Sequence, residues 1–164
     1  MPALLPSRPS VKTNVGMGQI AIGRDSDELI AVLGSCVGLV LLNPQQRLAV
    51  LAHVVLPASS GRAGLPGKYA DTAIPEMLDL LASEGQLASG LVAKLAGGAN
   101  MFGNSSGPMQ IGEGNIAAVT KILAQHNIRV IAKDLGGSKG RRVTVNCQTG
   151  LVEVEVVGTQ TALL

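Results

Sequence analysis

Apolar residues of this chain gather in short, dense runs that are separated by polar turns. Most of the runs are rich in Val, Leu and Ile and are too short for helices, which predicts β-strands. Two longer stretches, residues 71–84 and residues 112–126, repeat their apolar positions at helical spacing and predict helices. The predicted strands are residues 19–23, 28–33, 37–42, 48–56, 91–95, 128–134, 142–147 and 151–157.

The order of these elements decides the fold class. Many strands and two helices without regular alternation predict an α+β or layered α/β protein. Residues 16–158 form one predicted domain, which is large enough to bury most of its apolar surface. A Pro- and Ser-rich stretch, residues 1–15, predicts a flexible N-terminal tail, residues 159–164 a C-terminal tail, and residues 104–108 a flexible loop.

Two residues with catalytic chemistry flank one predicted hairpin. Residues 37–42 and 48–56 are dense in Val and Leu, and Asn-Pro-Gln-Gln at residues 43–46 predicts the turn between them. With this turn, Cys36 lies directly opposite His53, and opposed residues share a face with Cβ atoms ~5 Å apart. An error of one residue in the register turns His53 to the other face. The hairpin therefore suggests a cysteine–histidine pair without proving it.

Such a pair is suited to nucleophilic attack on a carbonyl group. A free cysteine has a pKa of ~8.5, and a neighbouring imidazole takes its proton to give a thiolate–imidazolium pair. The imidazolium then protonates a departing amine, and backbone N–H groups near Cys36 are candidates for an oxyanion hole. The ordinary interpretation of these residues is a small core cysteine and a structural histidine, and spacing alone favours that interpretation.

Composition excludes several other classes of function. A formal net charge of +2 and only two aromatic residues, Tyr69 and Phe102, argue against nucleic-acid binding. No apolar run reaches the ~20 residues that span a bilayer, and no signal peptide is recognised. We therefore expect a cytoplasmic protein that is not membrane-inserted. Two cysteines do not make a disulfide framework, and the histidines and cysteines lack zinc spacing, so no metal is expected.

The remaining candidate residues have simpler interpretations. Cys147 closes a strand beside a turn and is expected to be structural, while His126 suits the C-terminal cap of a helix. Residues 97–100, Gly-Gly-Ala-Asn, lack the ending of a phosphate loop and predict a tight turn or a pocket wall. A small basic cluster predicts either an anion or partner site or, more simply, a solvated turn; it consists of Lys139, Arg141 and Arg142.

Six blocks of sequence together resemble one protein family. The chain resembles the chemotaxis receptor deamidases, the CheD family, over most of residues 16–157. Each block is weak alone, whereas six in this order are specific. The blocks are Leu-Gly-Ser-Cys-Val at 33–37, Ala-His-Val-Val-Leu-Pro at 52–57, Lys-Tyr-Ala-Asp at 68–71, residues 94–102, Ile-Gly-Glu-Gly-Asn at 111–115, and Asp-Leu-Gly-Gly at 134–137 with Gly-Arg-Arg at 140–142.

The resemblance implies a protein-glutamine deamidase, which hydrolyses particular glutamine side chains of methyl-accepting chemoreceptors to glutamate and ammonia. It implies a layered αββα sandwich with mixed sheets, similar to the deamidating domain of cytotoxic necrotizing factor. In the family motif the nucleophile matches Cys36 and the base matches His53, and no metal or organic cofactor is needed. A CheC-type phosphatase is implied as a second partner.

One position departs from the family pattern. Family members carry a threonine six residues before the cysteine, which orients the histidine, whereas this chain has Ile30. A backbone carbonyl is then needed to accept the imidazole N–H, with Ser35 as the side-chain alternative. Two rival hypotheses remain open. One is a catalytically weakened module that binds and regulates a CheC-type phosphatase; the other is a cysteine peptidase or small-molecule amidase.

Overall fold

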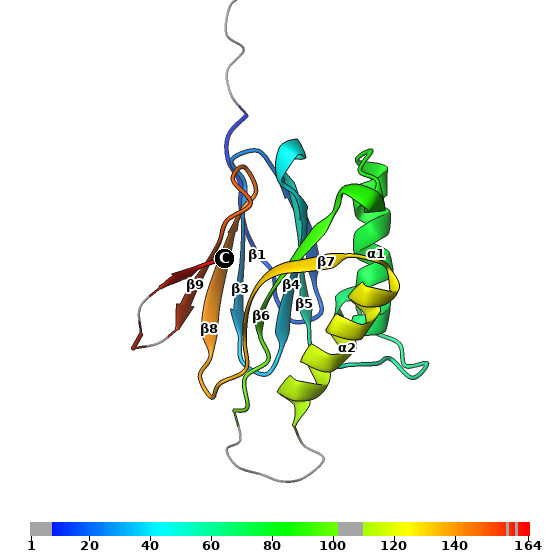
Figure 1. Cartoon of the computed structure of the whole chain (residues 1–164), viewed down its shortest axis with the longest axis vertical. Helices are drawn as coiled ribbons and strands as arrows, with labels where there is room; N and C mark the ends of the chain where they lie inside the picture. The colour runs from blue at the N-terminus through cyan, green and yellow to red at the C-terminus, as the bar shows by residue number, and fades with distance from the viewer. Residues whose placement is uncertain (1–7, 102–109, 157, 160) are drawn as a thin grey trace, which may run out of the picture.

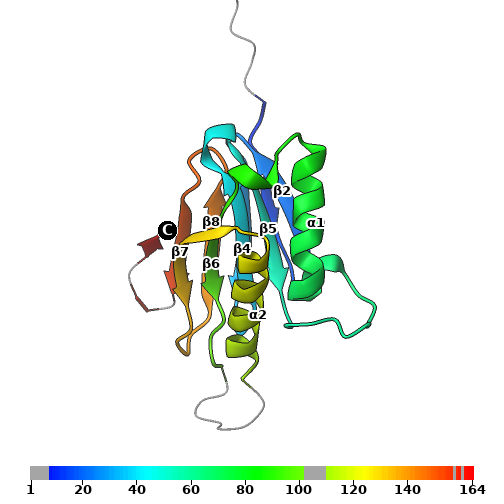
Figure 2. The same ribbon diagram turned by 45° about the vertical axis from the view of Figure 1, so that its right-hand side comes forward.

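Two β-sheets lie face to face, and two helices lie together on the outside of one of them (Figures 1 and 2). The computed structural model describes residues 8–101, 110–156, 158–159 and 161–164. The central sheet runs in the order β2 (Ile20–Arg24), β5 (Leu48–Val54), β4 (Val37–Asn43), β6 (Val92–Gly97) and β7 (Arg129–Leu135). The outer sheet runs in the order β1 (Lys12–Asn14), β3 (Glu28–Leu33), β8 (Arg141–Asn146), β9 (Val152–Val156) and β10 (Ala162–Leu163).

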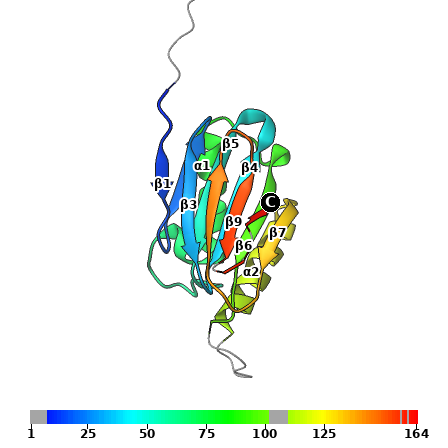
Figure 3. The same cartoon turned by 90° about the vertical axis from the view of Figure 1, so that its left-hand side faces the viewer.

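Each sheet is mixed, with β1 parallel to β3 and β6 parallel to β7. The helices α1 (Ala70–Ser83) and α2 (Ile111–Gln125) contact each other and the central sheet. The predicted α+β layered fold with two mixed sheets and two main helices is therefore confirmed. The order of layers differs from αββα in one respect, because both helices lie on the same side. Within the described ranges no α-helix covers the far face of the outer sheet (Figure 3).

The hairpin of β4 and β5 forms the centre of the molecule because both of its faces are apolar. Every residue of β5 is buried, and β4 is buried up to its last residue. Leu39 and Val50 pack in the core beneath the helices, whereas Val40 and Leu51 pack against the outer sheet. Since successive residues of a strand point to opposite faces, the unbroken apolar run of each strand fills both cores. Burial contributes ~1.5–3 kcal/mol for each such side chain.

The turn of this hairpin lies one residue later than the sequence predicts. Asn43 still belongs to β4 and pairs with Leu48. Its side chain accepts the N–H of Gln45 and so caps a short 3₁₀ helix, Pro44–Gln46. Arg47 completes the loop in the left-handed region, at φ 51°. Such a conformation is uncommon for a residue other than glycine, so the local pattern does not reveal it.

The displaced turn moves the register of the hairpin by two residues. His53 pairs with Gly38, whereas the sequence predicts that it pairs with Cys36. That prediction of direct opposition is wrong. The predicted face is nevertheless right, because a shift of two residues returns every side chain to the same side of the sheet.

Both ends of the described chain join the outer sheet. Residues 12–14, which the sequence places in the flexible tail, form β1 and pair with β3. Residues 162–163, which it places in the C-terminal tail, form β10 and pair with β9. These short edge strands depend on backbone hydrogen bonds to an existing sheet, and so they carry little hydrophobic pattern of their own. Residues 1–7 and the predicted loop 104–108 lie outside the described residues.

Candidate functional site

Cys36 and His53 lie at the same end of the central sheet, on neighbouring strands. Cys36 directly precedes β4, and His53 is the last residue but one of β5. Because Gly38 is the direct partner of His53, Cys36 occupies the diagonal position. Diagonal neighbours lie ~7–8 Å apart, within reach of long side chains. Cys36 belongs to the core that faces the outer sheet, and so does Leu51, whose side His53 shares by alternation.

The imidazole of His53 is oriented by a backbone carbonyl. The side chain is buried, and its Nδ1 lies 2.9 Å from the carbonyl oxygen of Val15. A carbonyl oxygen can only accept, so Nδ1 carries the proton and donates it to this bond. Nε2 of the neutral ring is then an unprotonated acceptor. It is buried and has no hydrogen-bond partner within the described part of the chain.

Val15 is itself held by the residue that replaces the family's threonine. The N–H of Val15 donates to the carbonyl of Ile30 at 2.7 Å, which extends the parallel pairing of β1 and β3 by one step. The backbone acceptor that Ile30 makes necessary is therefore present. No hydrogen bond joins Ser35 to the imidazole among the described residues. Sequence reasoning missed Val15 because a carbonyl has no residue signature and because the residue falls in the predicted tail.

The turn that carries Cys36 is held by its three consecutive carbonyl groups. Ala99 N–H donates to the carbonyl of Gly34 at 3.0 Å, and Gly98 N–H donates to that of Cys36 at 2.8 Å. Between them, Asn115 Nδ2 of α2 donates to the carbonyl of Ser35 at 3.1 Å. The predicted tight turn at residues 97–100 thus supports the cysteine directly. The sequence contains Asn115 only as the last residue of a family block and offers no sign of this contact.

Glycine is required where the two backbones meet. Gly97 has a φ of 101°, and a Cβ atom there would lie 2.3 Å from the carbonyl oxygen of Cys36. Gly112 at the start of α2 approaches the same loop, and a Cβ there would lie 2.5 Å from the carbonyl oxygen of Gly98. Both distances are below any van der Waals contact, so a side chain at either position pushes α2 or the loop away from Cys36.

Burial affects the protonation of the Cys36 thiol. Cys36 is 7% exposed, and this burial raises the pKa of its thiol, while its own backbone N–H opposes the rise. Desolvation disfavours the charged form, so the thiol is protonated at neutral pH in the resting protein. Burial therefore disfavours the thiolate form that the sequence leads us to expect, and Nε2 of His53 has no hydrogen bond to the sulfur among the described residues.

The pH dependence of alkylation checks this assignment. Iodoacetamide labelling of Cys36 is expected to accelerate with pH, with a midpoint above the ~8.5 of a free cysteine. Cys147 is expected to label later still, because burial, with Asp27 and Glu28 nearby, raises the pKa of its thiol to about 12. Peptide mass spectrometry separates the two sites, and denatured chain gives the ordinary midpoint for both. A Cys36 midpoint below pH ~8 contradicts the protonated resting thiol.

A cavity of about 280 Å³ opens beside the imidazole. It is lined by residues 14–17, residues 30–32 and His53, and Cys36 is not among its lining residues. Two large apolar side chains of this lining are unusually exposed, Met17 at 68% and Val32 at 70%. The cavity therefore lies open beside the imidazole, and exposed apolar side chains form part of its rim.

The other candidates from the sequence do not join this site. Cys147 is buried against Gly23 and Asp27, as a structural cysteine should be. His126 is the C-cap of α2, as predicted. No group of three or more His, Cys, Asp or Glu side chains suited to a metal ion occurs in the described ranges.

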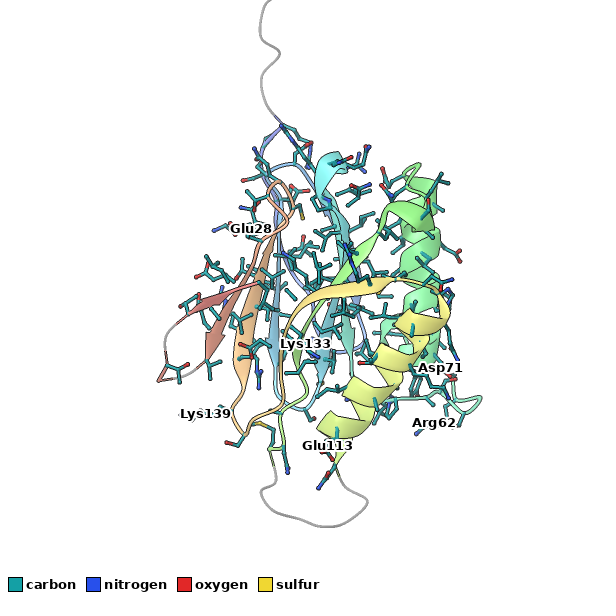
Figure 4. The ribbon with its side chains drawn as sticks, in the orientation of Figure 1. Glu28, Arg62, Asp71, Glu113, Lys133 and Lys139 are labelled. Carbon is teal, nitrogen blue, oxygen red and sulfur yellow. The ribbon has the colours of Figure 1, made fainter. Side chains whose placement is uncertain are left out.

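The predicted basic cluster does not exist as a group. Arg141 is 5% exposed, and its guanidinium donates to Asp134 and to the carbonyls of Gly136 and Lys139. It thereby closes the turn between β7 and β8 from inside, while Lys139 extends from that turn into solvent (Figure 4). Arg141 is unsuited to an anion site because it is buried and the turn already uses Nη1 and Nη2, and of the three residues only Lys139 and Arg142 are exposed.

The fold and the site together define a layered α+β protein whose central sheet carries a buried cysteine and a buried histidine on adjacent strands. Residues 55–156 match the family model CheD, which is described as chemotactic sensory transduction. The chain is 42% identical over 151 residues to the probable chemoreceptor glutamine deamidase CheD of Symbiobacterium thermophilum, with 88% of this chain and 92% of the relative covered. It is 39% identical over 149 residues to the chemoreceptor glutamine deamidase CheD of Thermotoga maritima, with 90% and 94% covered. The chain belongs to the CheD family.

The comparisons cover the chain unevenly. The family-model match begins at Val55, directly after β5, so it includes neither Cys36 nor His53. The similarity to the relatives extends over more of the chain. No helix within the described residues is both long and apolar enough to cross a membrane.

Proposed function

We propose that this protein is a chemoreceptor glutamine deamidase, which hydrolyses specific glutamine side chains of methyl-accepting chemoreceptors to glutamate and ammonia. The observation that carries the proposal is the placement of a free buried thiol on one strand beside a neighbouring strand that carries an imidazole, whose Nδ1 bonds to Val15 and whose Nε2 has no hydrogen-bond partner among the described residues. Relatives 39% and 42% identical are named for this activity. Free cysteines suit a reducing compartment, so the proposal includes a cytoplasmic location.

In the first step, Cys36 Sγ attacks the side-chain amide carbon of the glutamine. Because the resting thiol is protonated, its proton passes to His53 Nε2 as the carbon–sulfur bond forms. The hydrogen bond from Nδ1 to Val15 stabilises the imidazolium in the orientation that this transfer needs. The tetrahedral intermediate then collapses, the carbon–nitrogen bond breaks, and His53 returns the proton to the departing ammonia.

In the second step, water hydrolyses the thioester. Nε2 of His53, again neutral, takes a proton from the attacking water, and the new oxygen bonds to the thioester carbon. The carbon–sulfur bond breaks, the proton returns to Cys36, and glutamate is released. The same nitrogen serves as base and acid in both steps, which explains why a single acceptor without a competing partner is sufficient.

Incubation of the purified chain with a chemoreceptor from the same cell, read by peptide mass spectrometry, tests the proposal. The expected result is glutamate in place of glutamine at defined positions, a mass increase of about one unit on intact receptor, and release of ammonia. Cys36→Ala serves as the blank for spontaneous deamidation. Receptor that keeps its glutamines with the wild-type chain contradicts the proposal.

The same experiment separates the rival hypotheses. A peptidase gives shortened receptor chains, and a small-molecule amidase acts on free glutamine while leaving the receptor unchanged. A module that only regulates a CheC-type phosphatase binds that phosphatase and deamidates nothing. The weakened-module hypothesis depends on Ile30, and it loses its main support because the Val15 carbonyl supplies the acceptor that a threonine would otherwise provide. A CheC-type partner remains compatible with the enzyme and is tested separately by co-purification.

The apolar rim of the cavity provides a test of substrate docking. Met17→Asp is expected to lower kcat/KM for the receptor about tenfold, because the receptor no longer buries this side chain against an apolar surface. Leu87→Asp is the matched control, since Leu87 is 73% exposed but precedes β6 in a loop away from the cavity. Alkylation of Cys36 is expected to be the same in both variants. Equal kinetics for the two variants contradict a docking role for the rim.

A further inference from the structure

The peptide bond between Ser35 and Cys36 is held by a side chain from a distant helix. Asn115 lies on α2, two residues after Glu113, which marks the first turn of that helix in Figure 4. Its side chain is fully buried, and Nδ2 donates to the carbonyl of Ser35 at 3.1 Å and to the carbonyl of Val55 at 2.9 Å. One amide group thus ties the residue before Cys36 to the residue that follows β5.

The side-chain amide of Asn115 has an oxygen that is unpaired within the described chain. Both contacts of Asn115 are to carbonyl oxygens, which only accept, so the nitrogen must face them. The oxygen Oδ1 is buried and has no hydrogen-bond partner among the described residues. Leaving a buried acceptor unpaired is unfavourable, and an apolar side chain of similar size would avoid the penalty. The polar residue is therefore better explained by what its nitrogen holds than by packing.

The direction of the Cys36 N–H follows from this contact. In a trans peptide the C=O of one residue and the N–H of the next point in opposite directions, and no cis peptide occurs in the described chain. Asn115 draws the Ser35 carbonyl toward α2, so the N–H of Cys36 points away from the helix. That N–H has no backbone acceptor within the described residues and lies close enough to its own thiol to favour the thiolate.

We propose that Asn115 is a positioning residue, which holds the Ser35–Cys36 peptide so that the Cys36 N–H serves as an oxyanion-hole donor. The proposal rests on the deamidase function above. When Sγ bonds to the amide carbon, the negative charge moves to the substrate oxygen, and a backbone donor beside the sulfur stabilises it. Without Asn115 the Ser35 carbonyl loses this hydrogen bond, although Gly98 and Ala99 still hold the carbonyls on either side, and the Ser35–Cys36 peptide can then turn its carbonyl toward the developing charge.

Asn115→Ala and Asn115→Asp test the proposal, since both remove the donor and the second keeps the shape. Loss of one oxyanion donor lowers kcat by ~10²–10³-fold, and we expect about 10²-fold here, with KM within about twofold. The pH midpoint for iodoacetamide labelling of Cys36 is expected to rise, because its N–H no longer favours the thiolate. Labelling at pH values above the midpoint is expected to stay at the wild-type rate, since alkylation forms no oxyanion.

Two controls separate positioning from a general loss of structure. Leu123→Ala empties a fully buried site further along the same helix and is expected to lower the melting temperature while kcat of the folded fraction is unchanged. Cys147 is buried away from the site, and burial raises the pKa of its thiol to about 12, so at pH values well below 12 it labels only when the chain opens and reports unfolding in every variant. A loss of kcat that merely follows Cys147 labelling overturns the proposal.

The pH midpoint for labelling of Cys36 tests the positioning role of Asn115 even if the proposed deamidase function is wrong. If the wild-type chain deamidates no receptor, that function fails, but a raised Cys36 midpoint in Asn115→Ala still supports the hold on the Ser35–Cys36 peptide. An unchanged midpoint overturns the positioning role whether or not the chain is an enzyme. For an active wild-type chain, an unchanged kcat in both Asn115 variants overturns the link to the oxyanion.

Discussion

Replacement of Cys36 by alanine is expected to lower receptor deamidation by about 10⁴-fold or more, to the level of the uncatalysed reaction. The thioester cannot form without the sulfur, and no other thiol lies at this end of the central sheet, since Cys147 contacts Gly23 and Asp27 at the end of β2. Cys36→Ser keeps the geometry but offers a much weaker nucleophile, so it is expected to remain close to the alanine variant. Initial rates from peptide mass spectrometry measure the loss.

Cys147→Ala is the matched control for this prediction. Both cysteines are free and buried, and each belongs to the core between the two sheets. Removing Cys147 is expected to reduce the free energy of unfolding by about 1–2 kcal/mol through lost packing while leaving kcat unchanged. An equal loss of activity in the two variants, or substantial activity in Cys36→Ala, would falsify the nucleophile assignment.

Replacement of His53 by glutamine is expected to lower kcat by about 10³-fold or more. General acid–base catalysis contributes ~10²–10⁴-fold, and His53 transfers the proton in both steps of the proposed reaction. Glutamine has a similar size and can still donate to the Val15 carbonyl, but it offers no basic nitrogen at the position of Nε2. The loss is expected in kcat rather than in KM, as measured with receptor at varied concentration.

Chemical rescue sharpens the test of the base. His53→Ala opens a ring-sized space beside the 280 Å³ cavity, so added imidazole is expected to restore part of the rate. The rescue should increase with the fraction of imidazole in its neutral form. His126→Ala is the control, because this exposed C-cap of α2 lies outside the site and its loss should leave kcat unchanged. Failure of imidazole to rescue a folded His53→Ala, together with a small effect of His53→Gln, contradicts the role of a base.

The local sequence pattern predicts part of the arrangement of Cys36 and His53. The apolar runs on either side of residues 43–46 predict the hairpin, and its parity places Cys36 and His53 on one face. The register is off by two residues because the loop depends on Arg47 entering the left-handed region and on the side chain of Asn43 capping the turn. The face survives this error because the period of a strand is two.

Several contacts that hold Cys36 and His53 in place cannot be predicted from the local sequence pattern. Val15 acts through its carbonyl, and only the parallel pairing of β1 with β3 brings it to His53. Asn115 reaches Ser35 across 80 residues of sequence, and it does so because Gly98 and Gly112 let two backbones approach. Arg141 looks like part of a charged surface cluster but is buried, since its guanidinium bonds to the Asp134 carboxylate and to carbonyls of the turn between β7 and β8.

The sequence alone determined the strands β2 to β9 and both helices, the apolar hairpin at the centre, and the shared face of Cys36 and His53. These features depend on periodicity and turn chemistry within a few tens of residues, where the order of side chains dictates which face is buried. Tertiary structure decided the register, the orientation of the imidazole and the direction of the Cys36 peptide. Each of these depends on a backbone group or a buried amide brought from a distant segment, and such contacts form only when the two sheets and α2 have packed together.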